Sequence, residues 1–197
     1  MTGSHPVAVF VSGTGRHMEN FVRLSRTGEL DIDVRLVLSS TPRALAMEKA
    51  AALDVPAVAV PSKGTSEESY SKAIFAAASR AGAETILLAG FLKKLVVPAS
   101  WEDRILNIHP SLLPAFGGPG FYGDRVHRAA LERGVQVSGC TVHLVDGEYD
   151  HGRILLQRTC PVLPDDSPET LAGRVFDVEL EAYPSAVRDY LGESVPG

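Results

Sequence analysis

Two polar side chains stand two positions apart at the end of a short apolar stretch, in Leu106-Asn107-Ile108-His109. Alternate residues of a strand point to the same face, so we expect Asn107 and His109 to face one common point. An amide and an imidazole that donate to one oxygen atom can stabilise a developing oxyanion. A strand that ends in a hydrogen-bonded histidine with no catalytic role is the alternative interpretation.

A carboxylate that can pair with this imidazole lies later in the chain, in Asp150-His151-Gly152. A neighbouring carboxylate keeps an imidazole protonated and therefore able to donate. Asp-x-Gly is also common in turns, so Asp150 is a candidate only. We expect no metal site here, because Cys140 and His143 are three positions apart on a predicted strand and face opposite sides.

A glycine-containing turn at residues 12–17 follows the first apolar stretch. Its glycines allow a ligand to approach the backbone, and Arg16 and His17 at the start of the next predicted helix favour a bound phosphate. The turn is not a dinucleotide fingerprint, because Met18 replaces the third glycine and the second strand ends in Ser39-Ser40 without an acidic residue. It also lacks the Gly-Lys-Ser/Thr of a P-loop, and a turn without any ligand is the alternative.

Short β-branched stretches alternate with longer alanine-rich stretches in the first half of the chain. The pattern predicts strands at 6–11, 34–38, 57–60, 84–88 and 104–108. It predicts helices at 17–27, ending before Gly28, at 42–53 with Pro42 in the first turn, and at 66–81 with Ser66 as the cap. Such alternation is typical of parallel βαβ units.

The pattern changes after His109. A loop rich in glycine and proline at 110–123 precedes a predicted helix at 125–133. Strands at 136–145 and 153–161, joined by the polar turn 146–152, predict a hairpin, and a helix follows at 168–191. We therefore expect one α/β domain over 1–197, with a Rossmann-like, open and mostly parallel sheet. Helices should cover both faces, and antiparallel strands should lie at the C-terminal end of the sheet.

Composition restricts the possible partners. Nineteen Lys and Arg against 24 Asp and Glu give a net charge of −5, which argues against nucleic-acid binding. Apolar runs such as 7–11 are too short to span a bilayer, and no basic segment precedes an apolar one as in a secretory signal. Two cysteines, Cys140 and Cys160, do not make a disulfide framework. These features predict a cytoplasmic protein without a membrane partner.

Four segments in order resemble the family of folate-dependent formyltransferases, and within it the branch that acts on glycinamide ribonucleotide (GAR). The most specific is Asn107-Ile108-His109-Pro110-Ser111-Leu112-Leu113-Pro114. The others are residues 11–15, residues 88–95, and residues 141–145 continued to Asp150-x-Gly152, and the tail residues Arg174, Val175, Glu179, Tyr183 and Pro184 also fit.

The resemblance implies transfer of a formyl group from the co-substrate 10-formyltetrahydrofolate to the amine of GAR in purine biosynthesis, without a metal. It implies that Asn107, His109 and Asp150 are catalytic. It also implies a cis peptide bond between Leu113 and Pro114. Residues implied to bind GAR are Gly13, Thr14, Gly15, Arg16, His17 and Glu179, and those implied to bind the folate are Leu92, Lys93, Lys94, Leu95, Asp146, Gly147 and Tyr149.

The chain departs from this family at several places, including the three that follow. Arg16-His17 replaces the usual Ser/Thr-Asn, which leaves the phosphorylated substrate open. Another amine, such as an amino sugar nucleotide, and a non-catalytic nucleotide-binding module are therefore alternatives. His151 replaces a glycine and either competes for Asp150 or is merely exposed. The loop at 115–125 is either a mobile lid or a tolerated surface insertion.

Two other members of the family fit this chain less well. Methionyl-tRNA formyltransferase carries an added C-terminal domain, and formyltetrahydrofolate hydrolase an N-terminal regulatory domain. We expect neither domain here, because the first strand starts at Pro6 and the chain ends at Gly197. The expected partners are the two small substrates, and the expected state is a monomer or a homodimer.

Overall fold

The computed structural model describes residues 3–194, and these divide into two compact units, one up to residue 106 and one from residue 107 onward. Each unit is described separately below. The expected single domain over 1–197 includes residues 1–2 and 195–197, which lie outside the described residues, and it stays a prediction.

Parallel strands form the centre of the first unit. The strands β1 (His5–Val11), β2 (Ile32–Ser39), β3 (Ala57–Ala59) and β4 (Thr85–Ala89) are hydrogen-bonded in the order β3-β2-β1-β4. All three pairings are parallel. Residues Val7–Val11 of β1 are fully buried, as expected for a parallel strand that is covered on both faces. The first two residues of β5 (Ile105–His109) follow β4 in this order.

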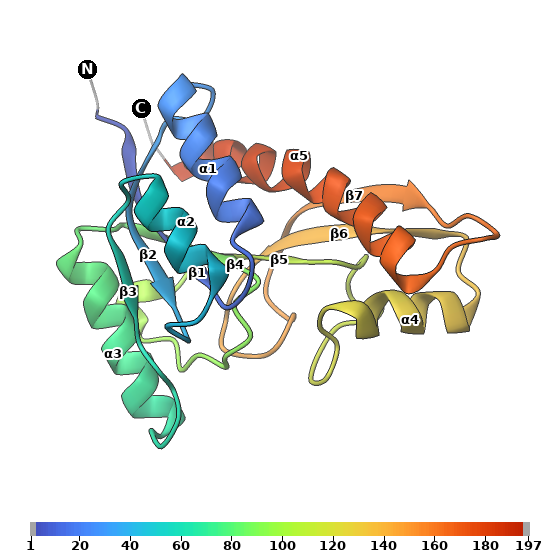
Figure 1. The fold of residues 1–197 in the computed structure, drawn as a ribbon, viewed down its shortest axis with the longest axis horizontal. Coiled ribbons are helices and arrows are strands. Elements are labelled where there is room, and N and C mark those ends of the chain that lie inside the picture. The colour runs from blue at the N-terminus through green and yellow to red at the C-terminus, as the bar shows by residue number, and fades with distance from the viewer. Residues whose placement is uncertain (1–2, 195–197) are drawn as a thin grey trace. The chain divides into compact units, whose positions relative to one another are not determined.

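Three helices connect these strands: α1 (Arg16–Thr27), α2 (Leu45–Ala52) and α3 (Glu67–Arg80). With right-handed crossovers, the strand order places α1 and α2 on one face of the sheet and α3 on the other. In Figure 1, α1 and α2 lie side by side, and Lys49 of α2 pairs with Glu19 of α1 at 2.6 Å. A short 3-10 helix, η1 (Ala99–Trp101), precedes β5.

The ends of these helices test the predicted capping residues. Gly28 ends α1 in the left-handed conformation, and Ser66 caps α3 by accepting from the Ser69 N–H at 3.2 Å, so both predictions are confirmed. The prediction that Pro42 lies in the first turn of a helix is wrong. Ser39 hydrogen-bonds both the N–H and the carbonyl of Thr41, which holds a turn there, and α2 begins only at Leu45.

Antiparallel strands and two helices form the second unit. The last three residues of β5 are followed in the sheet by β6 (Val137–Leu144) and β7 (Ile154–Pro161), which pair antiparallel. The helix α5 (Pro168–Ser194) packs along β6 and β7, and α4 (Asp124–Arg133) packs against α5 (Figure 1). The predicted α/β class, with a mostly parallel sheet and antiparallel strands at the C-terminal end, is confirmed. Within residues 3–194, no helix is long and apolar enough to span a membrane.

Candidate active site

The second unit brings Asn107 and His109 together with two residues of the β6–β7 hairpin. Both lie on β5, and His109 is only 4% exposed. Its Nδ1 lies 3.3 Å from Oδ1 of Asp150, and the same carboxylate oxygen lies 3.8 Å from Nε2 of His143. Nδ2 of Asn107 lies 3.0 Å from that Nε2. An amide, two imidazoles and a carboxylate therefore form one cluster, which we call the amide–imidazole cluster.

Hydrogen bonds at both ring nitrogens fix His109. Nε2 donates to the carbonyl oxygen of Phe116 at 2.8 Å, and Nδ1 faces Asp150 at the longer distance of 3.3 Å. Both partners, the Phe116 carbonyl and the Asp150 carboxylate, are hydrogen-bond acceptors. The shorter bond to Phe116 anchors the ring, and the contact of Nδ1 with Asp150 is the longer of the two.

His143 orients the amide of Asn107. Its Nδ1 donates to the carbonyl oxygen of Leu144 at 2.8 Å, which leaves Nε2 as an acceptor when the ring is neutral. The Nδ2 group of Asn107 then donates to that Nε2 with one of its two hydrogens. The second hydrogen remains for a ligand. His143 is 1% exposed, so water does not compete for these bonds.

Asp150 is held as a carboxylate. Burial by itself raises the pKa of Asp150, but the hydrogen bond from His109, the neighbouring His143 ring, the charge of His109 and the Gly118 N–H outweigh it. Together they hold the pKa of Asp150 well below its usual value. The Gly118 N–H donates to Oδ2 at 2.9 Å, while Oδ1 faces the two histidines.

The start of the loop after β5 is part of this cluster. Phe116 and Asp150 both have positive φ, 54° and 53°, a conformation that is strained for residues other than glycine. Phe116 supplies a carbonyl oxygen and Gly118 an N–H to the cluster. A Cβ at Gly117 would overlap the side chain of Leu113 and lie 3.3 Å from Cβ of Asp150. The strained residues and the close contact at Gly117 therefore lie where two catalytic candidates, His109 and Asp150, are held.

The remaining predicted residues of this unit lie in two other places. Glu179 is 6% exposed on α5. Asp146 lies in the exposed turn after β6 and pairs with Nδ1 of His151 at 2.7 Å. The hydrogen bond and charge of Asp146 raise the pKa of His151. Of the other predicted folate-binding residues in this turn, Tyr149 is exposed and Gly147 is half-buried.

In the first unit, the glycine turn meets two neighbouring segments at the carboxyl ends of the strands. The hydroxyl of Ser12 lies 2.9 Å from that of Ser40 and accepts from the Leu92 N–H at 3.3 Å. The turn therefore lies beside the predicted folate segment 92–95, at the edge where open parallel sheets bind ligands. Leu92, Lys93 and Lys94 are exposed, whereas Leu95 is buried.

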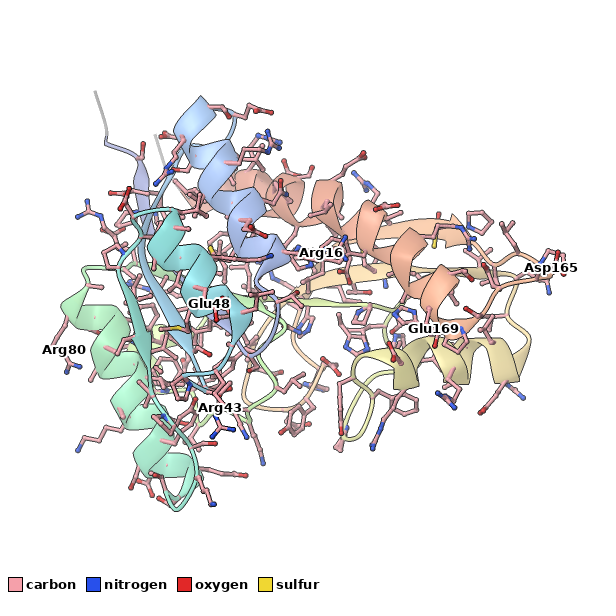
Figure 2. The ribbon with its side chains drawn as sticks, viewed as in Figure 1. Arg16, Arg43, Glu48, Arg80, Asp165 and Glu169 are labelled. Atoms are coloured by element: carbon pink, nitrogen blue, oxygen red, sulfur yellow. The ribbon has the colours of Figure 1, made fainter. Side chains whose placement is uncertain are left out.

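The glycine turn presents only some of its predicted residues to solvent. Gly13, Thr14 and Arg16 are exposed, and Figure 2 shows Arg16 at the N-terminal end of α1. His17 lies on the buried face of α1 at 8% exposure. Gly15 has φ of 74° and packs so closely that a Cβ there would lie 2.7 Å from Cβ of Ala46. The glycine at 15 is therefore required by the fold itself.

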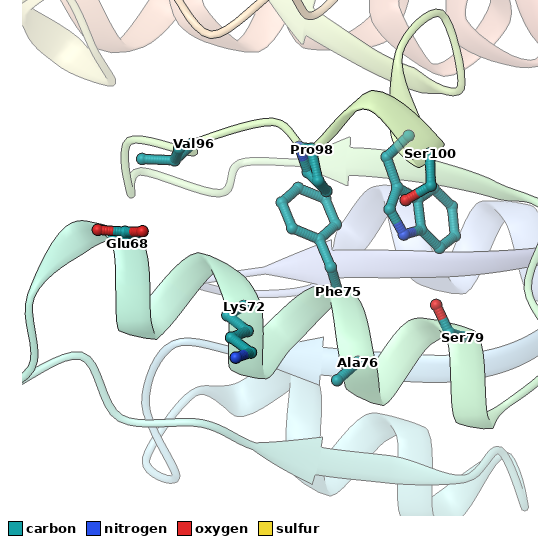
Figure 3. A pocket seen from close by; sticks show the side chains of 9 residues that line it. Glu68, Lys72, Phe75, Ala76, Ser79, Val96, Pro98 and Ser100 are labelled. Carbon is teal, nitrogen blue, oxygen red and sulfur yellow. The ribbon is translucent and has the colours of Figure 1, made fainter.

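A groove of about 390 Å³ lies in the first unit between α3 and the segment 96–101 (Figure 3). The rings of Phe75 and Trp101 stack in it with centroids 5.9 Å apart. Its lining includes none of the residues predicted to bind substrate.

Several functional groups were not predicted from the sequence. His143 was considered only as a metal ligand, although its place opposite Asn107 could have been suspected from the neighbouring strands. The Phe116 carbonyl and the Gly118 N–H are backbone groups, so the type of side chain at these positions does not indicate their contacts. Within residues 3–194, no cluster of three or more His, Cys, Asp or Glu side chains could hold a metal ion. Both cysteines are free and buried, and burial raises the pKa of Cys140 to about 12.

The amide–imidazole cluster lies on an α/β fold that matches a known family. Residues 5–187 match the model of the formyl transferase family. The chain therefore belongs to this family.

Relatives within the family carry a more specific name. The chain is 38% identical over 192 residues to a phosphoribosylglycinamide formyltransferase of Vigna unguiculata described as chloroplastic, covering 96% of this chain and 62% of that protein. It spans a similar 63% of the Arabidopsis thaliana enzyme of the same name. The chain thus spans less than two thirds of the length of these plant relatives.

Two solved structures share the fold over nearly their whole length. Glycinamide ribonucleotide transformylase 1 of Symbiobacterium toebii superposes with a TM-score of 0.91 at 33% identity, over 100% of this chain and 92% of the other. Phosphoribosylglycinamide formyltransferase of Brucella melitensis superposes with a TM-score of 0.85 at 36% identity, over 98% of each chain.

Proposed function

We propose that this protein transfers the formyl group of 10-formyltetrahydrofolate to the amine of GAR, in purine biosynthesis. The observation that carries the proposal is the amide–imidazole cluster, in which Asn107 and a doubly hydrogen-bonded His109 lie next to an ionised Asp150. The names of the relatives supply the substrates, and the cluster supplies groups suited to the reaction.

The amine nitrogen attacks the formyl carbon, and the electrons of the carbonyl double bond move to its oxygen. The free Nδ2 hydrogen of Asn107 and the Nδ1 proton of His109 stabilise that oxyanion. An α-amino group has a reference pKa of about 8, so a neutral fraction is present near neutral pH. When the intermediate collapses, the bond from carbon to the folate N10 breaks and N10 takes up a proton.

Asp150 has two parts in this mechanism. Its carboxylate lies 3.3 Å from Nδ1 of His109 and orients that side of the ring. As an ionised carboxylate it also orders a water molecule that relays the proton lost by the amine to the leaving nitrogen. The mechanism uses no covalent enzyme intermediate and no metal, and 10-formyltetrahydrofolate is a co-substrate.

Substrate binding is assigned to the residues that the family resemblance implies. The phosphate of GAR binds the turn of Gly13, Thr14, Gly15, Arg16 and His17, of which Gly13, Thr14 and Arg16 are accessible. Glu179 binds GAR. The folate binds residues 92–95 and the turn residues Asp146, Gly147 and Tyr149. We further propose a cytoplasmic protein with these small molecules as partners, acting as a monomer or a homodimer and without nucleic-acid or membrane partners.

The test is a spectrophotometric assay of folate release from 10-formyltetrahydrofolate with GAR and, separately, with an amino sugar nucleotide. We expect folate release in the assay with GAR and none in the assay with the amino sugar nucleotide. Release only with the amino sugar nucleotide would favour a transferase for another amine, which the unusual Arg16-His17 pair keeps open. Binding of nucleotide without any folate release would favour a non-catalytic module.

A further inference from the structure

Two side chains of the β6–β7 hairpin hold the loop that follows β5. Thr141 of β6 and Gln157 of β7 lie opposite each other in the antiparallel ladder. Thr141 is fully buried. It stands two positions before His143, so its side chain lies on the face of β6 that carries a member of the amide–imidazole cluster. Thr141 and Gln157 are not part of that cluster, and the proposed mechanism does not use them.

The hydroxyl of Thr141 uses its full hydrogen-bonding capacity. It donates to the carbonyl oxygen of Ser111 at 2.7 Å and accepts from the Leu113 N–H at 3.0 Å. It also accepts from Nε2 of Gln157 at 2.9 Å. A hydroxyl has one hydrogen and two lone pairs, and these three contacts use all of them. The hydroxyl therefore fixes where the segment 111–113 lies against the hairpin.

Gln157 completes this attachment of the loop. Its Nε2 group donates to the Thr141 hydroxyl and also to the carbonyl oxygen of Leu113, at 3.0 Å. Two side chains thus bind three backbone groups of the loop, namely the carbonyl of Ser111 and both the N–H and the carbonyl of Leu113. The contacts come from both strands of the hairpin, so the hairpin and the loop are joined as one piece.

The attached segment leads directly to a backbone group that fixes the cluster. Ser111 is 2% exposed, and its hydroxyl donates to the carbonyl oxygen of Ala115, which closes a turn over residues 111–115. The next residue, Phe116, supplies the carbonyl that accepts from Nε2 of His109. The position of the His109 ring therefore depends on how the turn before Phe116 is held.

We propose that Thr141 and Gln157 are positioning residues for formyl transfer, which act on His109 and Asp150 through the backbone of the loop. Phe116 carries the effect to His109, and the Gly118 N–H carries it to Asp150. The inference rests on the proposed function and adds to it two side chains that determine the geometry of the cluster.

Loss of the Thr141 hydroxyl should displace the loop. The carbonyl of Ser111 and the N–H of Leu113 would lose their partner in a buried place, where an unpaired polar group costs free energy. The loop would move to regain partners, and Phe116 would move with it. A displacement of about 1 Å in a positioned group can lower a rate about 10²-fold.

The first experiment compares two substitutions at Thr141. Thr141→Val keeps the shape of the side chain and removes the hydroxyl, whereas Thr141→Ser keeps the hydroxyl. In the assay with GAR and 10-formyltetrahydrofolate, we expect kcat to fall about 10²-fold in the Val variant and to recover most of its value in the Ser variant. KM for both substrates should change little, because the residues assigned to substrate binding lie outside the loop.

A second substitution tests the contribution of Gln157. Gln157→Met keeps the length of the side chain and removes the donor, but it leaves both contacts of the Thr141 hydroxyl with the loop. We expect kcat to fall only about tenfold, the equivalent of one hydrogen bond. Gln157 is an exposed residue, so this variant should fold and decides the inference if Thr141→Val does not fold.

A spectroscopic readout separates positioning from a general loss of stability. Heteronuclear NMR of the histidine rings reports the Nε2–H of His109, and its resonance should move in Thr141→Val. Thr85→Val is the matched control, because Thr85 of β4 is 2% exposed and its hydroxyl lies 2.9 Å from Nε2 of His5. This control should lose thermal stability while kcat and the His109 resonance stay at their wild-type values.

A folded Thr141→Val with the kcat of wild type, or equal losses of kcat in Thr141→Val and Thr141→Ser, would overturn the inference while the proposed function stands. A wild-type protein that releases no folate with GAR would contradict the proposed function instead. The NMR comparison would still apply in that case, and an unchanged His109 resonance in Thr141→Val would then overturn the positioning role as well.

Discussion

At the scale of single residues, Asp150 is the group on which the amide–imidazole cluster depends. One oxygen of its carboxylate faces His109 and His143, and the other accepts from the Gly118 N–H. The carboxylate thereby ties the hairpin turn to β5 and to the loop that follows it. A change at Asp150 should accordingly affect both stability and chemistry.

The depressed pKa of Asp150 predicts how acid affects stability. An unfolded aspartate titrates at about 3.9, whereas folded Asp150 stays ionised to lower pH. The unfolded state therefore binds an extra proton as the pH falls below about 4, and the free energy of unfolding decreases until the folded pKa is reached. Urea unfolding near pH 6 and about pH 3 should show a smaller acid loss in Asp150→Asn than in wild type. Equal losses would contradict the assigned electrostatics.

His143 is predicted to act through Asn107. His143→Leu removes the acceptor that orients the amide, and we expect kcat to fall about tenfold with little change in KM. His143→Gln can place an amide oxygen where Nε2 lies, so it should recover much of the loss. Steady-state kinetics of both variants decide the matter, and equal activity of the Leu and Gln variants would refute the orienting role.

The proximity of Asn107, His109 and Asp150 could be predicted from the sequence because an amide, an imidazole and a carboxylate suit one chemistry and their motifs resemble a family; their catalytic role stays a prediction. The contacts of the Phe116 carbonyl and the Gly118 N–H could not be predicted, because every residue has a carbonyl group and every residue except proline has an N–H. Their contribution depends on a loop conformation with positive φ at a phenylalanine, which no local pattern indicates.

At the scale of elements, the β6–β7 hairpin carries Asp150 and His143 and leaves no space at its base. A Cβ at Gly152 would overlap the carbonyl oxygen of Leu144, the same atom that accepts from Nδ1 of His143. Gly152→Ala should lower the free energy of unfolding by about 1–3 kcal/mol and reduce turnover.

Gly173→Ala is the control for that variant. Gly173 lies in α5 with open space around its Cα, so alanine there should stabilise the protein by about 0.5–1 kcal/mol. Chemical denaturation measures both variants. A Gly152→Ala protein as stable and active as wild type would show that the hairpin base can relax at no cost.

The glycine turn offers a second matched pair. A methyl group at Gly13 meets nothing within 4 Å, whereas one at Gly15 would lie against Ala46 in a left-handed backbone conformation. Gly15→Ala should lose about 1–2 kcal/mol of stability. Gly13→Ala should fold normally and raise the KM for GAR about tenfold, by blocking close approach of a phosphate. An unchanged KM in Gly13→Ala would remove the turn from the binding site.

Most elements could be predicted because their signals are local, such as the buried valines of β1 or the Ser66 cap of α3. The start of α2 could not. Pro42 is compatible with a first helical turn, but the hydroxyl of Ser39 binds the backbone of Thr41 and delays the helix by three residues, from 42 to 45.

At the scale of the whole molecule, the parallel pairing of the first strands follows from the alternation of strands and helices, and the hairpin follows from its polar turn. The pairing of Nδ1 of His109 with Asp150, 41 positions later in the chain, depends on how β5 and the hairpin pack and is not encoded locally. Family resemblance supplied that pairing where physical patterns alone left it open.

The central claim is that Asn107, His109 and Asp150 act together in formyl transfer to GAR. Steady-state turnover of Asp150→Asn with GAR and 10-formyltetrahydrofolate tests it most directly, together with the Kd of the folate. We predict that kcat falls by about 10²–10³ while folate binding is retained. Turnover close to that of wild type would contradict the account.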